Sequence, residues 1–185
     1  LVIHNVLCND TRIFFLKILK NVNANIKINN LRKISGELIG SITVSSSKLR
    51  PIIISKDIGK FIDELPILFI IAALTKGISK FKNVGDLKNK ESNRLLECKK
   101  ILIQAGIKCK ITKDSMVIYG KDKIENQNKL ILTKTKGDHR ICMSSVILSL
   151  VTGIRTKIKN FETVNTSFPG FITLIKNLGG NIVIE

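Results

Sequence analysis

The chain has 185 residues, of which 44% are hydrophobic, so it can bury one core and is not expected to be disordered. Its formal net charge of +17 would suit nucleic acid, a membrane surface or small anionic substrates. The lysines are scattered without a basic run and only 5% of the residues are aromatic, so we expect small anions, with no nucleic-acid partner and no membrane partner.

Short periodic segments alternate along the chain and predict an α/β fold. Strands are predicted at 2–6, 25–30, 41–47, 51–55, 78–84, 107–112, 115–120, 129–135, 155–161 and 181–185. Helices are predicted at 11–22, 63–77, 93–106, 138–153 and 167–179. The longest apolar run, Leu65 to Leu74, is about half of a membrane span and is interpreted as a core helix.

The segments also recur as an internal repeat. The two most apolar helices are each followed by a glycine stop, Gly77 and Gly153, and by a strand that ends near an asparagine, Asn83 and Asn160. The two copies beginning with these helices are complete at their start, whereas the first copy begins at strand 2–6 without such a helix. The pattern predicts a pseudo-threefold domain whose first repeat is truncated at its start.

The second part of the repeat occurs three times, as a helix, a turn and a strand. Gly106 and the pair Gly179-Gly180 lie where a helix C-terminus favours a left-handed residue, and Asn23-Ala24-Asn25 is the less ideal substitute in the first copy.

The four cysteines form no Cys-x-x-Cys pair and lie in apolar sequence. They are predicted to be buried thiols of a reducing compartment. These residues are Cys8, Cys98, Cys109 and Cys142.

Three charged clusters precede predicted helices, where free N–H groups and the helix dipole attract anions. They are Asp63-Glu64, then Lys90, Glu91 and Arg94, then Asp138-His139-Arg140.

Each cluster also has a simpler explanation. Asp63 could only complement a helix dipole, Lys90 and Arg94 could lie in a solvated first turn, and Asp138 could be only an N-cap. However, Arg94 and Arg140 stand at the positive ends of their helices, which is unfavourable without an anion. We therefore predict that both point into one cleft and grip a carboxylate or phosphate there.

The ordered motifs IDELPIL, NKESNRL, GDHRICMSSVILSL and NTSFPGF resemble those of the 5-enolpyruvylshikimate-3-phosphate synthase (3-phosphoshikimate 1-carboxyvinyltransferase) family, bacterial type. The resemblance spans nearly the whole chain and lies in the family's C-terminal half. It implies the enolpyruvyl transferase fold, with two domains of three βαβαββ repeats and a substrate cleft between them. Residues 1–185 would then be the C-terminal domain of a two-domain enzyme, with the N-terminal domain absent.

The resemblance implies transfer of the enolpyruvyl group of phosphoenolpyruvate to the 5-hydroxyl of shikimate 3-phosphate, with release of phosphate. This is a cytoplasmic step of the shikimate pathway, in aromatic amino acid and chorismate biosynthesis. It implies no metal or organic cofactor, and a monomer when complete. Since the substrate-binding residues of the family's N-terminal domain do not occur here, the chain alone is expected to be an inactive fragment.

The resemblance also assigns roles to individual residues. Asp63 would contact the shikimate hydroxyls and accept a proton, and Glu91 would handle the proton at the methylene carbon of phosphoenolpyruvate. The other implied contacts are Lys90 at shikimate 3-phosphate, Arg94 and Arg140 at phosphoenolpyruvate, and His139 in the pocket lining.

Two departures from the family pattern stand out. Asn93 replaces an Asp that is expected to be a partner of Arg94 or Lys90, and Gly170 replaces an acidic residue. Two other functions stay open. One is UDP-N-acetylglucosamine enolpyruvyl transferase, which shares the fold and donor, and the other is a non-catalytic basic module that binds phosphates or nucleic acid.

Overall fold

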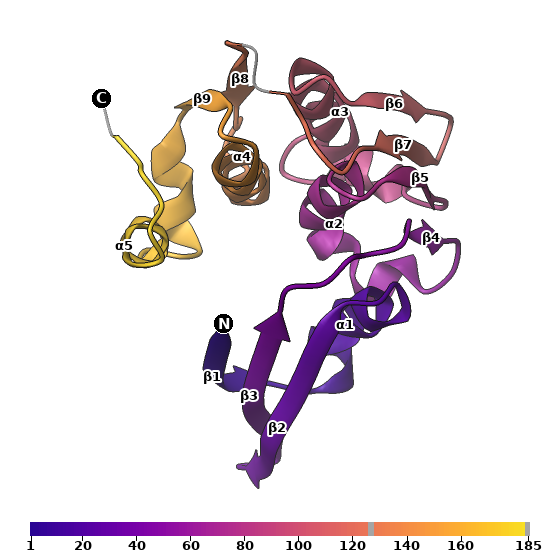
Figure 1. Ribbon diagram of the computed structural model, residues 1–185. Helices are drawn as coiled ribbons and strands as arrows, with labels where there is room; N and C mark the ends of the chain where they lie inside the picture. Colours follow the sequence, from indigo (N-terminus) through magenta and orange to yellow (C-terminus); the bar gives the residue numbers. More distant parts are fainter. Residues whose placement is uncertain (126–127, 184–185) are drawn as a thin grey trace.

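The computed structural model describes residues 1–125 and 128–183, in which strands and helices alternate (Figure 1). The strands are β1 (Val2–Leu7), β2 (Asn25–Ile34), β3 (Glu37–Ser45), β4 (Ile53–Ile54), β5 (Gly77–Phe81), β6 (Lys108–Ile111), β7 (Met116–Gly120), β8 (Leu130–Lys134) and β9 (Arg155–Lys159). The helices are α1 (Asp10–Asn21), α2 (Leu65–Ala73), α3 (Arg94–Gln104), α4 (His139–Thr152) and α5 (Phe171–Asn177). Short 3-10 turns are η1 (Ile58–Lys60), η2 (Ile62–Glu64), η3 (Gly85–Asn89) and η4 (Phe161–Thr166).

The strands form three sheets, with the orders β1-β3-β2, β4-β5-β7-β6 and β8-β9. Helix α2 connects the parallel strands β4 and β5, and α4 connects the parallel strands β8 and β9. The antiparallel set β5-β7-β6 has the same order as β1-β3-β2, and each set follows the chain as strand, helix and hairpin. The predicted α/β fold of repeated units is therefore confirmed, because β1 to β3 correspond to the second part of the unit β4 to β7.

Helices α1, α3 and α5 end in the same way, as predicted. The residue after each C-cap is left-handed, with φ of 75° at Asn23, 82° at Gly106 and 90° at Gly179. The next residue then donates its N–H to a carbonyl of the last helical turn, as in a Schellman motif. These bonds are Ala24 to Leu19, Ile107 to Leu102 and Gly180 to Ile175, each 2.9 Å.

The strand ends also repeat, but one predicted helix stop is wrong. Asn83 and Asn160 share a φ of 59° after β5 and β9. Gly153 caps α4 with a φ of 69°, whereas Gly77 is the first residue of β5 and α2 already ends at Ala73. Gly77 is required for another reason, because its φ is 121° and an added Cβ would lie 2.6 Å from Cγ of Pro51.

Prolines explain where two helices begin. Helix α2 starts at Leu65 rather than at 63, because Pro66 is tolerated only in the first turn. Helix α5 starts at Phe171 rather than at 167, because Phe168 precedes Pro169 and is disfavoured in a helical conformation.

Four predicted strands differ clearly in extent from the structure. The hairpin of β2 and β3 extends at its outer end beyond the predicted strands 25–30 and 41–47. This outer part was not predicted because it is exposed on both faces and shows no hydrophobic alternation. Only Ile53–Ile54 of the predicted strand 51–55 is paired. In the predicted strand 181–185, residues 181–183 are not in a strand, and 184–185 lie outside the described residues.

The main core joins α1, α2 and α3 to the first two sheets, and a smaller cluster lies under α4, η4 and α5. Helix α2 is apolar on every side, and seven of its nine residues are accordingly buried. Gln104 of α3 connects the repeats, since its side chain accepts a hydrogen bond from the Leu132 N–H (2.8 Å) and donates one to the Leu132 carbonyl (3.3 Å). Within the described residues, no helix is long and apolar enough to cross a bilayer.

Gly120 ends β7 directly against the C-terminal end of α2. A Cβ at this position would collide with the backbone carbonyl oxygens of Thr75 and Ala72. Gly120→Ala is therefore expected to lower the free energy of unfolding by about 1–3 kcal/mol, as measured by urea denaturation. Gly59→Ala is the control, because a Cβ there meets nothing within 4 Å, and equal losses in both variants would contradict this account.

Candidate active site

The predicted charged clusters meet where α2, α3 and α4 begin. Asp63 lies in η2 just before α2, Arg94 is the first residue of α3, and Arg140 is the second residue of α4. The three helices contact one another pairwise (Figure 1), so their N-terminal ends come together although they are far apart in the sequence.

Arg94 is the centre of the cluster, and its side chain is only 1% exposed. Its Nε donates to Oδ2 of Asp138 (2.8 Å), its Nη1 to Oδ1 of Asp63 (2.8 Å), and its Nη2 to Oε2 of Glu91 (2.6 Å). Two edges of the guanidinium are thus occupied by carboxylates of the chain itself.

The buried guanidinium remains charged because its partners compensate for the lost hydration. Burial alone would lower the pKa of Arg94, but the hydrogen bond and the charge of Asp138, with the charge of Glu91, raise it above its ordinary value. The guanidinium of Arg94 is therefore charged at neutral pH.

Asp63 is contacted by three cationic side chains. Its Oδ1 accepts from Arg94 and lies 3.2 Å from Nζ of Lys90, while Nη1 of Arg140 donates to its backbone carbonyl (2.8 Å) and lies 3.4 Å from Oε1 of Glu64. Partial burial would raise the pKa of Asp63, but the hydrogen bond from Lys90 and the charge of Arg140 outweigh it and lower the pKa below its usual value. Asp63 is therefore ionised at neutral pH.

Asp138 makes contacts beyond the N-cap expected from the sequence. Its Oδ1 does cap α4, since it accepts from the N–H groups of Arg140 (3.0 Å) and Ile141 (3.4 Å). Its Oδ2 accepts from Arg94 and from Oγ of Ser92 (2.9 Å). Asp138 is fully buried, and its second set of contacts connects it to the start of α3.

The remaining predicted residues are more accessible. The exposed fraction of the side chain is 29% for Lys90, 50% for Glu91 and 32% for Arg140, and His139 is half-buried. Arg94 differs from the expectation, because it is enclosed rather than open to a cleft. The chain's own carboxylates occupy the positions around Arg94 where an external anion was expected.

Asn93 has a different role from the one expected. Its Oδ1 accepts from the N–H of Leu96 (3.0 Å) and caps α3. Since Asp63, Glu91 and Asp138 already pair with Arg94, the lack of a carboxylate at Asn93 does not leave that arginine without partners.

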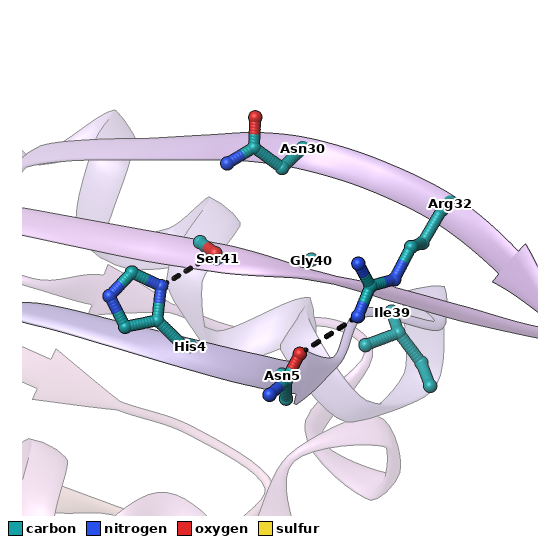
Figure 2. A pocket seen from close by; sticks show the side chains of 7 residues that line it. All are labelled: His4, Asn5, Asn30, Arg32, Ile39, Gly40 and Ser41. Atoms are coloured by element: carbon teal, nitrogen blue, oxygen red, sulfur yellow. Dashed lines mark hydrogen bonds between the residues drawn. The ribbon is translucent and has the colours of Figure 1, made fainter.

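A separate hollow of about 250 Å³ lies on the β1-β3-β2 sheet (Figure 2). Asn5 and Asn30, each with a φ of 54°, mark β-bulges on either side of β3. Arg32 donates to Asn5 (3.0 Å) and His4 pairs with Ser41 (3.1 Å), so these polar groups satisfy one another across the strands. The hollow contains none of the predicted site residues.

The four cysteines are free and buried, as predicted. Burial raises the pKa of Cys142 to about 12 and also raises that of Cys98 and Cys109. These three side chains are therefore protonated thiols at neutral pH rather than nucleophiles.

Comparison with protein families gives one match, since the model of EPSP synthase (3-phosphoshikimate 1-carboxyvinyltransferase) matches residues 1–175. Among curated relatives, the 3-phosphoshikimate 1-carboxyvinyltransferase of Clostridium tetani is 35% identical over 178 residues, which are 96% of this chain and 40% of the relative. That of Campylobacter jejuni subsp. doylei is 37% identical over 182 residues, 98% of this chain and 41% of the relative. The chain thus spans about two fifths of the length of these relatives.

Solved structures agree with this match. The EPSP synthase of Acinetobacter baumannii has a TM-score of 0.85 at 33% identity, over the whole of this chain and 42% of that one. The enolpyruvyl transferase NikO of Streptomyces tendae has a TM-score of 0.63 at 15% identity, over 90% of this chain and 35% of that one, which shows a shared fold.

Proposed function

Because the chain belongs to the EPSP synthase family, we propose that it carries one side of the active site of a 3-phosphoshikimate 1-carboxyvinyltransferase. The enzyme would transfer the enolpyruvyl group of phosphoenolpyruvate to the 5-hydroxyl of shikimate 3-phosphate and release phosphate. The observation that carries the proposal is the meeting of five residues at three helix starts. These are Asp63, Lys90, Glu91, Arg94 and Arg140.

The proposed chemistry needs three proton movements. The 5-hydroxyl oxygen bonds to C2 of phosphoenolpyruvate and gives up its proton, while the methylene carbon gains one. Loss of phosphate and of a proton from that carbon then restores the double bond. Asp63 is proposed to accept the hydroxyl proton, which its ionised state supports. Glu91 is proposed to give and then remove the carbon proton, and its half-exposed carboxyl can exchange protons with solvent.

The cations would hold the two anionic substrates and stabilise the charge that develops during the reaction. Lys90 is proposed to bind the phosphate of shikimate 3-phosphate, and Arg94 with Arg140 to bind phosphoenolpyruvate. His139 would line the same pocket. Lys90 and Arg140 are the readily accessible cations, whereas Arg94 can reach a substrate only after Asp63 or Glu91 moves.

We further propose that a second domain completes the cleft, since the matched relatives are more than twice as long as this chain. The free, buried thiols fit a reducing compartment such as the cytoplasm. We also propose that the complete enzyme works as a monomer without metal or organic cofactor. A UDP-N-acetylglucosamine enolpyruvyl transferase is less well supported, because the relatives at 35% and 37% identity are named 3-phosphoshikimate 1-carboxyvinyltransferase.

The test combines this chain with the part of the Clostridium tetani relative that the match does not cover, which we propose is its N-terminal domain. Phosphate release is measured with phosphoenolpyruvate and either shikimate 3-phosphate or UDP-N-acetylglucosamine. We expect release only with shikimate 3-phosphate, only from the combined protein, and not from either part alone. Release with the UDP sugar, or none with either acceptor from a combined protein that folds, would contradict the proposal.

A further inference from the structure

The partners of Arg94 fall into two classes by exposure. Asp138, bound to Nε, is 0% exposed, whereas the side chains of Asp63 and Glu91, bound to Nη1 and Nη2, are 43% and 50% exposed. The two exposed carboxylates can rotate into water at small cost, but Asp138 cannot leave without giving up a charge-assisted bond in a dry environment.

Asp138 also connects the two arginines of the cluster. Its Oδ1 accepts from the backbone N–H of Arg140, and its Oδ2 accepts from Arg94 and Ser92. One carboxylate thereby fixes the start of α4 against the start of α3.

The loop that presents Asp138 is itself held in place. The N–H of Asp138 donates to the carbonyl of Thr135 (2.9 Å), and Thr163 donates from Oγ1 to the carbonyl of Gly137 (2.8 Å). Asp138 is thus held in place by its own loop before any ligand arrives.

The cluster has no excess positive charge to offer an incoming anion. Three cations face four carboxylates: Lys90, Arg94 and Arg140, against Asp63, Glu64, Glu91 and Asp138. An anion that reaches Arg94 must therefore take the place of a carboxylate, and the two half-exposed ones are the ones free to move.

We propose that Asp138 is the positioning residue of this anion site. It keeps the Nε edge of Arg94 fixed, while the Nη1 and Nη2 edge exchanges Asp63 and Glu91 for the phosphate or carboxylate of a substrate. This inference rests on the proposed function, because it takes the cluster to be a site for anionic substrates. Asp138 need not touch the substrate, since it acts through Arg94 and through the start of α4.

The test uses the 185-residue chain, inorganic phosphate as the probe, and Asp138→Asn. Asparagine can still cap α4, but its NH₂ group would face two donors, Nε of Arg94 and Oγ of Ser92. Isothermal titration should show phosphate binding about tenfold weaker than in the unmodified chain. The Nε–H resonance of Arg94 in the ¹⁵N–¹H spectrum should shift or broaden, which a purely structural effect elsewhere would not cause.

The matched control is Glu97→Gln on α3. Glu97 is also buried and ion-paired, to Lys100 and Lys136, but does not contact Arg94. The Glu97→Gln variant should bind phosphate with an affinity within about twofold of the unmodified chain, and its Arg94 Nε–H resonance should not shift. If Asp138→Asn does not fold, Ser92→Ala is the second variant. It removes one hydrogen bond to Oδ2 of Asp138 but keeps the charge of Asp138 and its cap of α4, and it should weaken phosphate binding by about two- to threefold.

Three outcomes would overturn the inference. They are unchanged phosphate affinity in folded Asp138→Asn, an equal loss in Glu97→Gln, and no phosphate binding by the unmodified chain. The proposed function fails separately, in the transfer assay with the combined protein. A chain that binds phosphate through Asp138 but supports no transfer would keep the inference as an anion site and remove the proposed reaction.

Discussion

Replacing Glu91 with glutamine is expected to lower the transfer rate of the combined enzyme by about 10²–10⁴-fold. Glutamine keeps the shape of the side chain and an oxygen that can accept from Nη2 of Arg94. It cannot deliver a proton to the methylene carbon of phosphoenolpyruvate or remove one from it. The measurement is kcat from phosphate release with both substrates saturating.

The same substitution should have the opposite effect on binding. Glu91 competes with an incoming anion for Arg94, so Glu91→Gln should bind inorganic phosphate more tightly while it turns over more slowly. Glu97→Gln on α3 serves as the control and should change neither quantity by more than about twofold. A Glu91→Gln enzyme with a rate within threefold of the unmodified enzyme would remove Glu91 from the proposed chemistry.

Arg94→Met is expected to have the largest effect on stability. It would leave Asp138, which is fully buried, without its cation, and breaking a buried pair in this way costs about 3–5 kcal/mol. Asp63 and Glu91 should add little to the loss, because both are near half exposed and can be hydrated. Urea denaturation of the 185-residue chain, with the slope compared between variants, measures the free energy of unfolding.

A double substitution distinguishes the lost charge pair from lost packing. Arg94→Met with Asp138→Asn removes both charges, so it should recover part of the stability that Arg94→Met alone loses. Arg50→Met is the matched control, since the side chain of Arg50 is exposed and donates to the carbonyl of Asn21, and its effect should stay within about 0.5 kcal/mol. A double variant less stable than Arg94→Met would show that the buried pair is not the cause.

Much of the fold could be predicted from periodicity and turn residues. The left-handed positions at Asn23, Gly106 and Gly179 were recognisable because a helix C-terminus requires an unusual φ that few residue types adopt. The outer part of the β2–β3 hairpin could not be predicted, because both of its faces are exposed and its side chains do not alternate. Gly77 was misleading, since close contact with Pro51, rather than a helix end, explains the glycine.

The candidate site was predictable in part. Basic residues at helix starts identified Arg94 and Arg140, because a cation at the positive end of a helix dipole is costly without an anion. The roles of Lys90 and Glu91 came from the family resemblance. The second role of Asp138 was not predictable, since its bond to Arg94 crosses 44 positions of the sequence and depends on how α3 packs on α4. A local cap already explained an Asp at that position, so nothing in the sequence called for a second partner.

The contact between Gln104 and Leu132 has a consequence for how the protein behaves in a crowded solution. At the edge of β8 that faces away from β9, the N–H and C=O of Leu132 would otherwise be free to pair with an extended peptide. The primary amide of Gln104 has the same donor and acceptor as a peptide bond, so it imitates one residue of a neighbouring strand. A single side chain thus makes it harder for a second polypeptide to add itself to this short ladder and begin an aggregate.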